Sequence, residues 1–117
     1  MSYKPGLHIL SEITTTHRAL LEDFAPIQQF FHEKIAFYHL QSVGEVFHAF
    51  AEGGYTGVIC LTESHLAIHT WPEYGVATFD LYLSNFQRDN DATTRQLFEA
   101  TVQFFSPSRY TRKEVKR

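Results

Sequence analysis

The sequence has almost no cysteine and no long hydrophobic run, so neither disulfides nor a membrane anchor is expected to stabilise or locate the protein. Its 117 residues include one cysteine, Cys60, and no apolar run long enough to span a bilayer. A single cysteine excludes an internal disulfide framework. Because Cys60 lies in the apolar run 58–61, we expect a buried, reduced thiol. There is no signal-peptide pattern, and together these absences favour a cytoplasmic protein that does not bind membranes.

Positive charge is scarce over most of the chain. The net charge is −3, and five of the ten Lys and Arg residues lie in the last nine positions, so the rest of the chain is acidic. A basic tail can contact nucleic acid, but a short, solvated edge strand is the simpler interpretation. We therefore expect no nucleic-acid partner.

What is present is sufficient for one domain. Hydrophobic residues make up 44% of the chain, and 11 of them are Phe, so the core should be rich in aromatic rings. We expect residues 1–117 to form a single domain.

Apolar periodicity predicts strands separated by two main helices. Helical spacing covers 26–38 and 91–105, with a short helical turn at 20–24. Extended segments are predicted at 7–13, 42–50, 56–63, 66–71, 76–83 and 109–115. The segments 66–71 and 76–83 flank a proline and a glycine, and they form either two strands or one bent strand.

The resulting order, β-α-β-β-β-α-β, predicts an α+β fold. Short connections between strands indicate an antiparallel sheet, and the two helices should cover one face of it in a two-layer α/β sandwich. The other sheet face then needs a cover. In a chain this short, a second copy is the natural candidate, so we expect a homodimer.

Residues 62–75 contain the densest group of side chains that can perform chemistry, in the order T-E-S-H-L-A-I-H-T-W-P-E-Y-G. The spacing His65-x-x-x-His69 suits a metal site on a helix, but Thr70, Trp71 and Pro72 disfavour a helix here. A serine hydrolase is disfavoured because no G-x-S-x-G motif is present. Polar and aromatic residues between two apolar runs are typical of a site at a strand junction.

Ser64 and His69 lie five positions apart, which is an odd spacing. In one regular strand this spacing points their side chains to opposite faces. The two can meet only if the chain bends or bulges between them, and bulges are frequent beside active sites.

Residues 63–75 resemble the signature of the small prokaryotic S-adenosylmethionine decarboxylases, which reads E-S-H-[IL]-[SA]-I-H-T-W-P-E-Y-G. The match is long and ungapped. The family's next strand begins with an A-x-x-D pattern, found here at 77–80, and the patterns Gly6-x-His8 and Thr56-Gly57 also fit. The expected layout of helices and strands agrees along most of the chain.

The resemblance implies that the protein makes its own cofactor. In the family, the peptide bond between Glu and Ser shifts to an ester on the Ser oxygen, and β-elimination leaves a pyruvoyl group at the new N-terminus. Carried over to this chain, cleavage falls between Glu63 and Ser64 and yields chains 1–63 and 64–117. The pyruvoyl group would form a Schiff base with the substrate amine and act as an electron sink.

The resemblance also implies roles for other residues. His69 would be the base in the elimination step and a wall of the adenine pocket, and Thr56 would supply a hydroxyl that assists processing. Phe50 would stack on adenine, Trp71 would line the pocket, and Glu73 would accept the ribose hydroxyls. These residue types fit the substrate, since aromatic faces attract a sulfonium cation and a carboxylate accepts two hydroxyl bonds.

One position departs from the family pattern. The strand after the signature usually ends in T-C-G, and that Cys donates a proton in catalysis. Here Ser84 stands at the Cys position. A serine hydroxyl is a far weaker acid than a thiol, so the source of the proton is open.

The implied function is decarboxylation of S-adenosylmethionine for spermidine biosynthesis. One alternative is a pyruvoyl-dependent arginine or ornithine decarboxylase, because the Glu73 carboxylate can bind a guanidinium or an amine as readily as a ribose diol. Another is an inactive homologue that regulates a partner subunit, which only Ser84 supports. Phe50 and Trp71 favour the nucleoside substrate.

Overall fold

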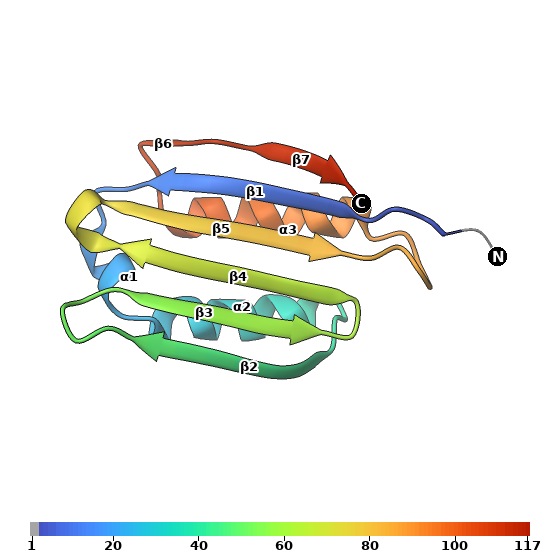
Figure 1. Cartoon of the computed structure of the whole chain (residues 1–117), viewed down its shortest axis with the longest axis horizontal. Helices are drawn as coiled ribbons and strands as arrows, with labels where there is room; N and C mark the ends of the chain where they lie inside the picture. The colour runs from blue at the N-terminus through green and yellow to red at the C-terminus, as the bar shows by residue number, and fades with distance from the viewer. Residues whose placement is uncertain (1–2) are drawn as a thin grey trace.

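The computed structural model describes residues 3–117, and its elements form a sheet with helices on one side (Figure 1). The helices are α1 (Arg18–Glu22), α2 (Ala25–Phe37) and α3 (Asp91–Phe104), with a short 3₁₀ helix, η1, at Pro72–Tyr74. The strands are β1 (Leu7–Thr14), β2 (Ser42–Ala49), β3 (Tyr55–Leu61), β4 (Ser64–Trp71), β5 (Val76–Leu83), β6 (Arg109–Tyr110) and β7 (Lys113–Lys116).

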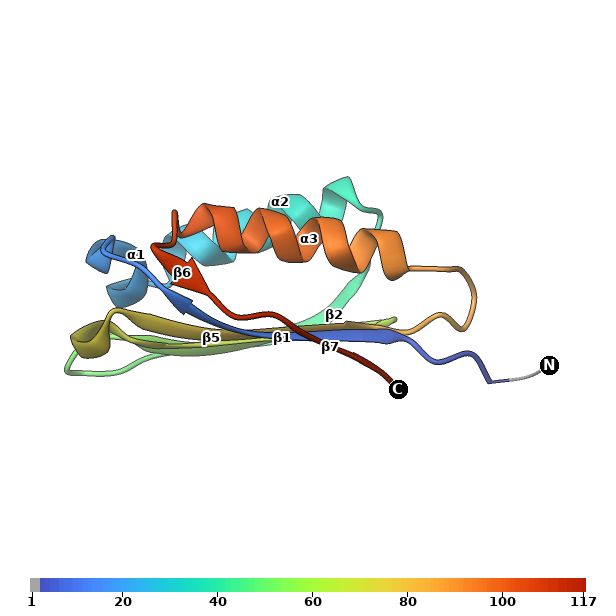
Figure 2. The same cartoon turned by 90° about the horizontal axis from the view of Figure 1, so that it is seen from above.

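The sheet is antiparallel throughout, in the order β2-β3-β4-β5-β1, with β6 and β7 both paired to β1. Helices α2 and α3 lie on one face (Figure 2). The expected α+β sandwich is therefore confirmed. β4 and β5 are two separate strands, because η1 and Gly75, whose φ of 66° is left-handed, reverse the chain between them. The expected basic edge strand is divided into β6 and β7.

The core lies between the sheet and the two long helices. Strand β5 alternates half-buried and buried residues, as a strand with one covered face must. Aromatic rings dominate the packing, as the composition predicted: Phe79 stacks on Phe31 from α2 and on Phe98 from α3, with ring centroids 5.8 and 6.2 Å apart. No described helix is long and apolar enough to cross a membrane.

Cys60 corrects one expectation, because its thiol is exposed. In β3 the residues at odd positions, Tyr55, Ile59 and Leu61, are buried against the helices. Strand alternation then points Val58 and Cys60 to the opposite side. The continuous apolar run 58–61 thus reflects a strand that is apolar on both faces, and the described residues cover only one of them.

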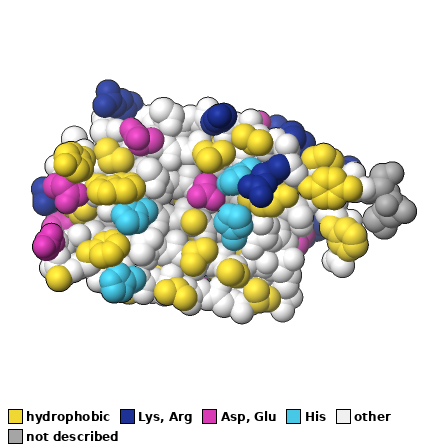
Figure 3. Space-filling model, in the orientation of Figure 1, with side chains coloured by type: hydrophobic (Ala, Val, Ile, Leu, Met, Phe, Trp, Pro, Cys, Tyr) yellow, Lys and Arg dark blue, Asp and Glu magenta, His cyan; other side chains and the backbone are white. Residues whose placement is uncertain are grey.

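The face of the sheet away from the helices, called here the open sheet face, has no covering layer among the described residues. It carries hydrophobic side chains together with histidines (Figure 3). Its large exposed hydrophobic residues are Leu10, Val46, Phe50, Val58 and Trp71. Several large hydrophobic side chains exposed on one face of a small protein are typical of a contact surface.

Candidate functional site

Strand β4 carries most of the 62–75 stretch and runs without interruption. Its register with both neighbours is continuous, placing Ser64 opposite Leu61 and Leu83 and placing His69 opposite Thr56 and Thr78. A strand advances about 3.3 Å per residue, so the five steps from Ser64 to His69 span about 16 Å. The bend that would bring these two side chains together is absent from β4, and they lie toward opposite ends of the strand.

The first end holds the turn that links β3 to β4, residues 62–64, called here the cleavage turn. Ser64 has φ of 127°, which residues with a Cβ rarely adopt and which costs about 1–3 kcal/mol. The Ser84 backbone N–H donates a hydrogen bond of 2.8 Å to the Glu63 carbonyl oxygen. A donor on this oxygen polarises the carbonyl and is placed to stabilise negative charge on it.

The Glu63 side chain anchors the same turn. Arg88 donates two hydrogen bonds to its carboxylate, of 3.0 and 2.8 Å, and Asn90 Nδ2 donates one of 2.6 Å. The Arg88 hydrogen bond, helped by Asn90, holds the pKa of the Glu63 carboxyl below its ordinary value despite the opposing effect of partial burial. Arg88 and Asn90 have no sequence signal, because their role depends on how the 84–90 connection folds back.

Ser84 lies beside this turn. It lines a hollow of about 440 Å³ together with Thr62, Glu63 and Arg88. A Cβ at Gly6 would lie 2.3 Å from the Leu83 carbonyl oxygen and 3.0 Å from the Ser84 Cα, so only glycine allows β1 to approach this closely. The structure therefore brings Glu63, Ser64 and Ser84 together.

Three further residues lie at this end of the open sheet face. They are His8 on β1, His65 on β4 and Asp80 on β5, and their ligand-type atoms all lie within 4.8 Å of one another. The sequence analysis did not group them. Their meeting depends on the β4-β5-β1 register, which no local sequence pattern reports.

The second end of β4 holds the residues expected to bind substrate. The His69 ring lies 4.1 Å from the Trp71 ring and 5.6 Å from the Phe50 ring, measured between centroids. With Glu73, these three line a hollow of about 400 Å³, called here the aromatic hollow. The structure thus brings all four predicted residues into one place, where aromatic faces and a carboxylate can receive a flat, polar ring system with hydroxyl groups.

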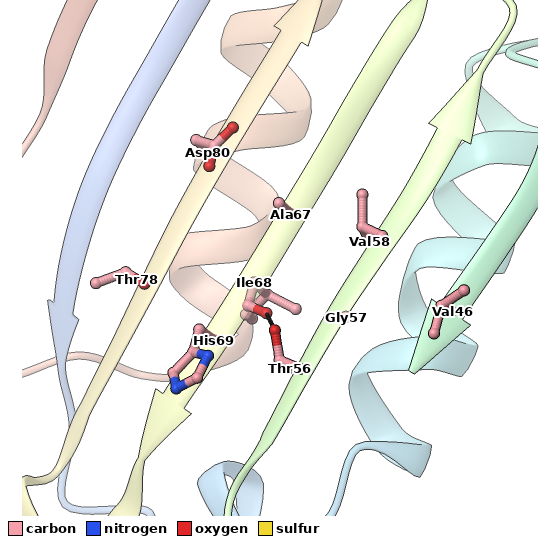
Figure 4. Close-up of a pocket in the computed structure, with 9 residues that line it drawn as sticks. All are labelled: Val46, Thr56, Gly57, Val58, Ala67, Ile68, His69, Thr78 and Asp80. Carbon is pink, nitrogen blue, oxygen red and sulfur yellow. Dashed lines mark hydrogen bonds between the residues drawn. The ribbon is translucent and has the colours of Figure 1, made fainter. Parts of the chain in front are cut away.

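Thr56 lies on the same side of the sheet as His69, across the β3-β4 pair. Both line a shallower hollow of about 240 Å³ in the middle of the open sheet face (Figure 4). The Thr56 hydroxyl is 3.5 Å from the Ile68 carbonyl oxygen. Ala67 leaves room in this hollow, because its side chain is a single methyl group.

This chain is similar to known proteins of one family. The family model described as S-adenosylmethionine decarboxylase matches residues 7–117. A protein of Fervidobacterium nodosum named S-adenosylmethionine decarboxylase proenzyme is 42% identical over 79 residues, which are 66% of this chain but only 56% of that protein. A protein of the same name from Picrophilus torridus is 31% identical over 108 residues, covering 89% of this chain and 83% of its own length.

The structural comparison extends over nearly the whole chain. The crystal structure of the adenosylmethionine decarboxylase from Aquifex aeolicus matches with a TM-score of 0.86 and 25% identity, covering 99% of this chain and 92% of that one. Over its matched stretch, the chain spans little more than half the length of the Fervidobacterium relative. The family-model match, the relatives and the common fold show that this chain belongs to the S-adenosylmethionine decarboxylase family.

Proposed function

We propose that this protein is a pyruvoyl-dependent S-adenosylmethionine decarboxylase of spermidine biosynthesis that activates itself by cleavage between Glu63 and Ser64. The observation that carries the proposal is the cleavage turn: a strained serine follows a carbonyl that is already hydrogen-bonded by the Ser84 N–H. The relatives' printed names support it, since they are proenzymes of this decarboxylase.

The cleavage turn suits a shift of the peptide bond to the serine oxygen. Arg88 and Asn90 hold the Glu63 side chain, which fixes the carbonyl carbon that Ser64 Oγ would attack. The Ser84 N–H stabilises the oxyanion that forms on the Glu63 carbonyl oxygen. Breaking the peptide bond also releases the constraint on the Ser64 backbone, which favours the reaction.

The pyruvoyl group produced at residue 64 supplies the electron sink for decarboxylation. The chain's own residues supply recognition. In the aromatic hollow, Phe50 and His69 are placed to hold the adenine ring, Trp71 lines the pocket, and the Glu73 carboxylate accepts the ribose hydroxyls.

One chain cannot complete this site, because Ser64 and His69 are about 16 Å apart on β4. A second copy can. If two open sheet faces pack together about a two-fold axis that crosses the strands, the Ser64 end of one β4 lies over the His69 end of its partner. Packed sheets lie about 10 Å apart, a gap that side chains and a substrate fill. We therefore place each active site between the Ser64 end of one chain and the aromatic hollow of the other.

The alternatives have less support. An arginine or ornithine decarboxylase would need the cleavage turn but would not need the ring-binding character of Phe50, His69 and Trp71. A regulatory subunit without activity would not need the cleavage turn, which this chain keeps with Ser64 strained and the Glu63 carbonyl hydrogen-bonded.

Intact mass and substrate assays test the proposal together. The purified protein should consist of two chains, 1–63 and 64–117, with the second beginning in a pyruvoyl group, and it should release carbon dioxide from S-adenosylmethionine. Ser64→Ala should stay whole and inactive. Release of carbon dioxide from arginine or ornithine alone would move the substrate to the first alternative, and a wild-type chain that never cleaves would support the second.

A further inference from the structure

A chain of hydrogen-bonding groups leads from Ser64 to a buried histidine, and nothing assigned so far uses it. Ser64 Oγ lies 3.1 Å from His65 Nδ1. The other ring nitrogen, His65 Nε2, lies 3.3 Å from Asp80 Oδ1. His8 Nε2 approaches the same oxygen at 3.1 Å. Strands β4, β5 and β1 therefore converge on a series of polar groups that begins at the hydroxyl required for cleavage.

Consecutive residues in a regular strand point to opposite faces, so Ser64 and His65 would not normally meet. They meet here because Ser64 has φ of 127°, which turns its side chain toward the ring of its neighbour. The strained backbone at Ser64 thus brings the Ser64 hydroxyl to the Nδ1 atom of the His65 ring.

The neighbours of the two histidines assign their protons. Arg117 Nη1 lies 3.4 Å from His8 Nδ1. A guanidinium can only donate, so His8 Nδ1 accepts and His8 Nε2 carries the proton that faces Asp80. His65 Nε2 lies 3.3 Å from the same carboxylate, which can only accept, so we place the His65 proton on Nε2. This leaves His65 Nδ1 without a proton, and it faces the Ser64 hydroxyl.

A metal ion is the other use for two histidines and an aspartate. The surroundings oppose it. Arg117 contacts His8 and lies 5.0 Å from the centre of the Tyr82 ring, which puts a permanent positive charge beside the place a cation would occupy. The polar contacts already described also give a partner to each ring nitrogen of both histidines.

We propose that His65 is the general base that activates Ser64 for self-cleavage, with Asp80 and His8 as positioning residues. The inference rests on the proposed function. Ser64 Oγ gives its proton to His65 Nδ1 as the bond from Oγ to the Glu63 carbonyl carbon forms. The bond from that carbon to the Ser64 nitrogen then breaks, and His65 returns the proton to the nitrogen, giving an ester and a free amine. No other reactant is consumed.

The arrangement resembles a serine, histidine and aspartate catalytic triad, except that Nδ1 faces the serine and Nε2 faces the aspartate. This assignment also gives the two histidines of β4 different roles. His65 acts on the hydroxyl within its own chain, whereas His69 belongs to the aromatic hollow. The ester-forming step can therefore lose its base without any change to the substrate pocket, whereas the later elimination still needs His69.

The test follows cleavage of newly made protein by intact mass over time. His65→Ala should slow cleavage about 100-fold or more, the usual contribution of a general base. Imidazole added to this variant should restore at least about a tenth of the lost rate, which a purely structural defect would not show. His65→Asn keeps a hydrogen-bonding group near Ser64 but cannot take its proton, so it should be equally slow while remaining folded by circular dichroism.

Asp80→Asn tests the positioning role. Its amide can donate to His65 Nε2, which moves the ring proton to Nδ1. Nδ1 can then no longer accept the proton of the Ser64 hydroxyl. We expect slow cleavage with an unchanged fold and no effect of EDTA on the wild-type rate. His17→Ala, an exposed histidine before α1, is the matched control and should cleave normally.

The outcomes separate this inference from the function. If the wild-type chain cleaves and His65→Asn cleaves equally fast, the base is another group. The inference about His65 then fails, while the proposed function stands. If EDTA stops wild-type cleavage and Zn²⁺ restores it, a metal replaces the proposed proton transfer. If the wild-type chain never cleaves, the proposed function fails first.

Discussion

Ser84 has two separable contributions to the site. Its backbone N–H holds the Glu63 carbonyl oxygen at 2.8 Å, whereas its side chain stands where the family has a proton-donating cysteine. The backbone contribution does not depend on the side chain. A chain with Ser84 in place of the family's cysteine can therefore keep the geometry for self-cleavage. The replacement should affect only the return of a proton to the substrate after decarboxylation.

The prediction at this residue separates cleavage from turnover. Ser84→Ala and Ser84→Cys should both cleave at the wild-type rate. Ser84→Cys should raise turnover of S-adenosylmethionine and lengthen the active lifetime, because a thiol is a far stronger acid than a hydroxyl. Cleavage is measured by intact mass, and turnover by release of labelled carbon dioxide. If neither variant alters turnover, the side chain has no part in returning the proton.

At the scale of elements, Asn90 ties the cleavage turn to the start of α3. It is the N-cap residue of α3 and is 1% exposed. Its side-chain amide donates to the Glu63 carboxylate at 2.6 Å and to the Ser84 carbonyl oxygen at 2.8 Å. One buried side chain therefore joins the end of β5, the turn before β4 and a helix. Arg88 holds the same carboxylate from a more exposed position.

Asn90→Ala should therefore lower the free energy of unfolding more than Arg88→Ala does. Removing the buried amide leaves a carboxylate and a carbonyl without their partner, for roughly 2–3 kcal/mol of unfolding free energy. Removing Arg88, an exposed ion-pair partner, should cost about 1 kcal/mol or less. Urea unfolding of the uncleaved Ser64→Ala background measures both without interference from cleavage. Equal costs would contradict the anchoring role of Asn90.

The elements also show what local sequence patterns could and could not predict. Strand and helix positions follow apolar periodicity, so β1 to β5, α2 and α3 were predicted from the sequence. The grouping of His8, His65 and Asp80 follows from register across three strands, which no local pattern reports. Parity alone would put Ser64 and His69 on opposite faces, but the positive φ of Ser64 turns its hydroxyl toward His65, and it is the distance along β4 that separates Ser64 from His69.

At the scale of the whole molecule, the open sheet face explains the remaining differences. Cys60 was expected to be buried because its run is apolar on both faces, which is typical of strands covered on both sides. Residues 3–117 cover only one side. The apolar side chains of the open sheet face and this run are what our proposal of a second copy on that face accounts for.

The central claim is that two copies share each active site, and mixed dimers test it most directly. Ser64→Ala and His69→Ala, expressed together with different tags and purified through both, give a dimer with one complete pair of Ser64 and the partner's His69. Size-exclusion chromatography with light scattering checks the dimer mass. Each variant alone should form no pyruvoyl group and should not decarboxylate S-adenosylmethionine.

The mixed dimer should release carbon dioxide from S-adenosylmethionine at about half the wild-type rate per dimer, because one of its two sites is complete. Intact mass should show the pyruvoyl group only on the chain that carries His69→Ala. A mixed dimer that stays as inactive as either variant alone would contradict the account, since Ser64 and His69 would then have to act within one chain.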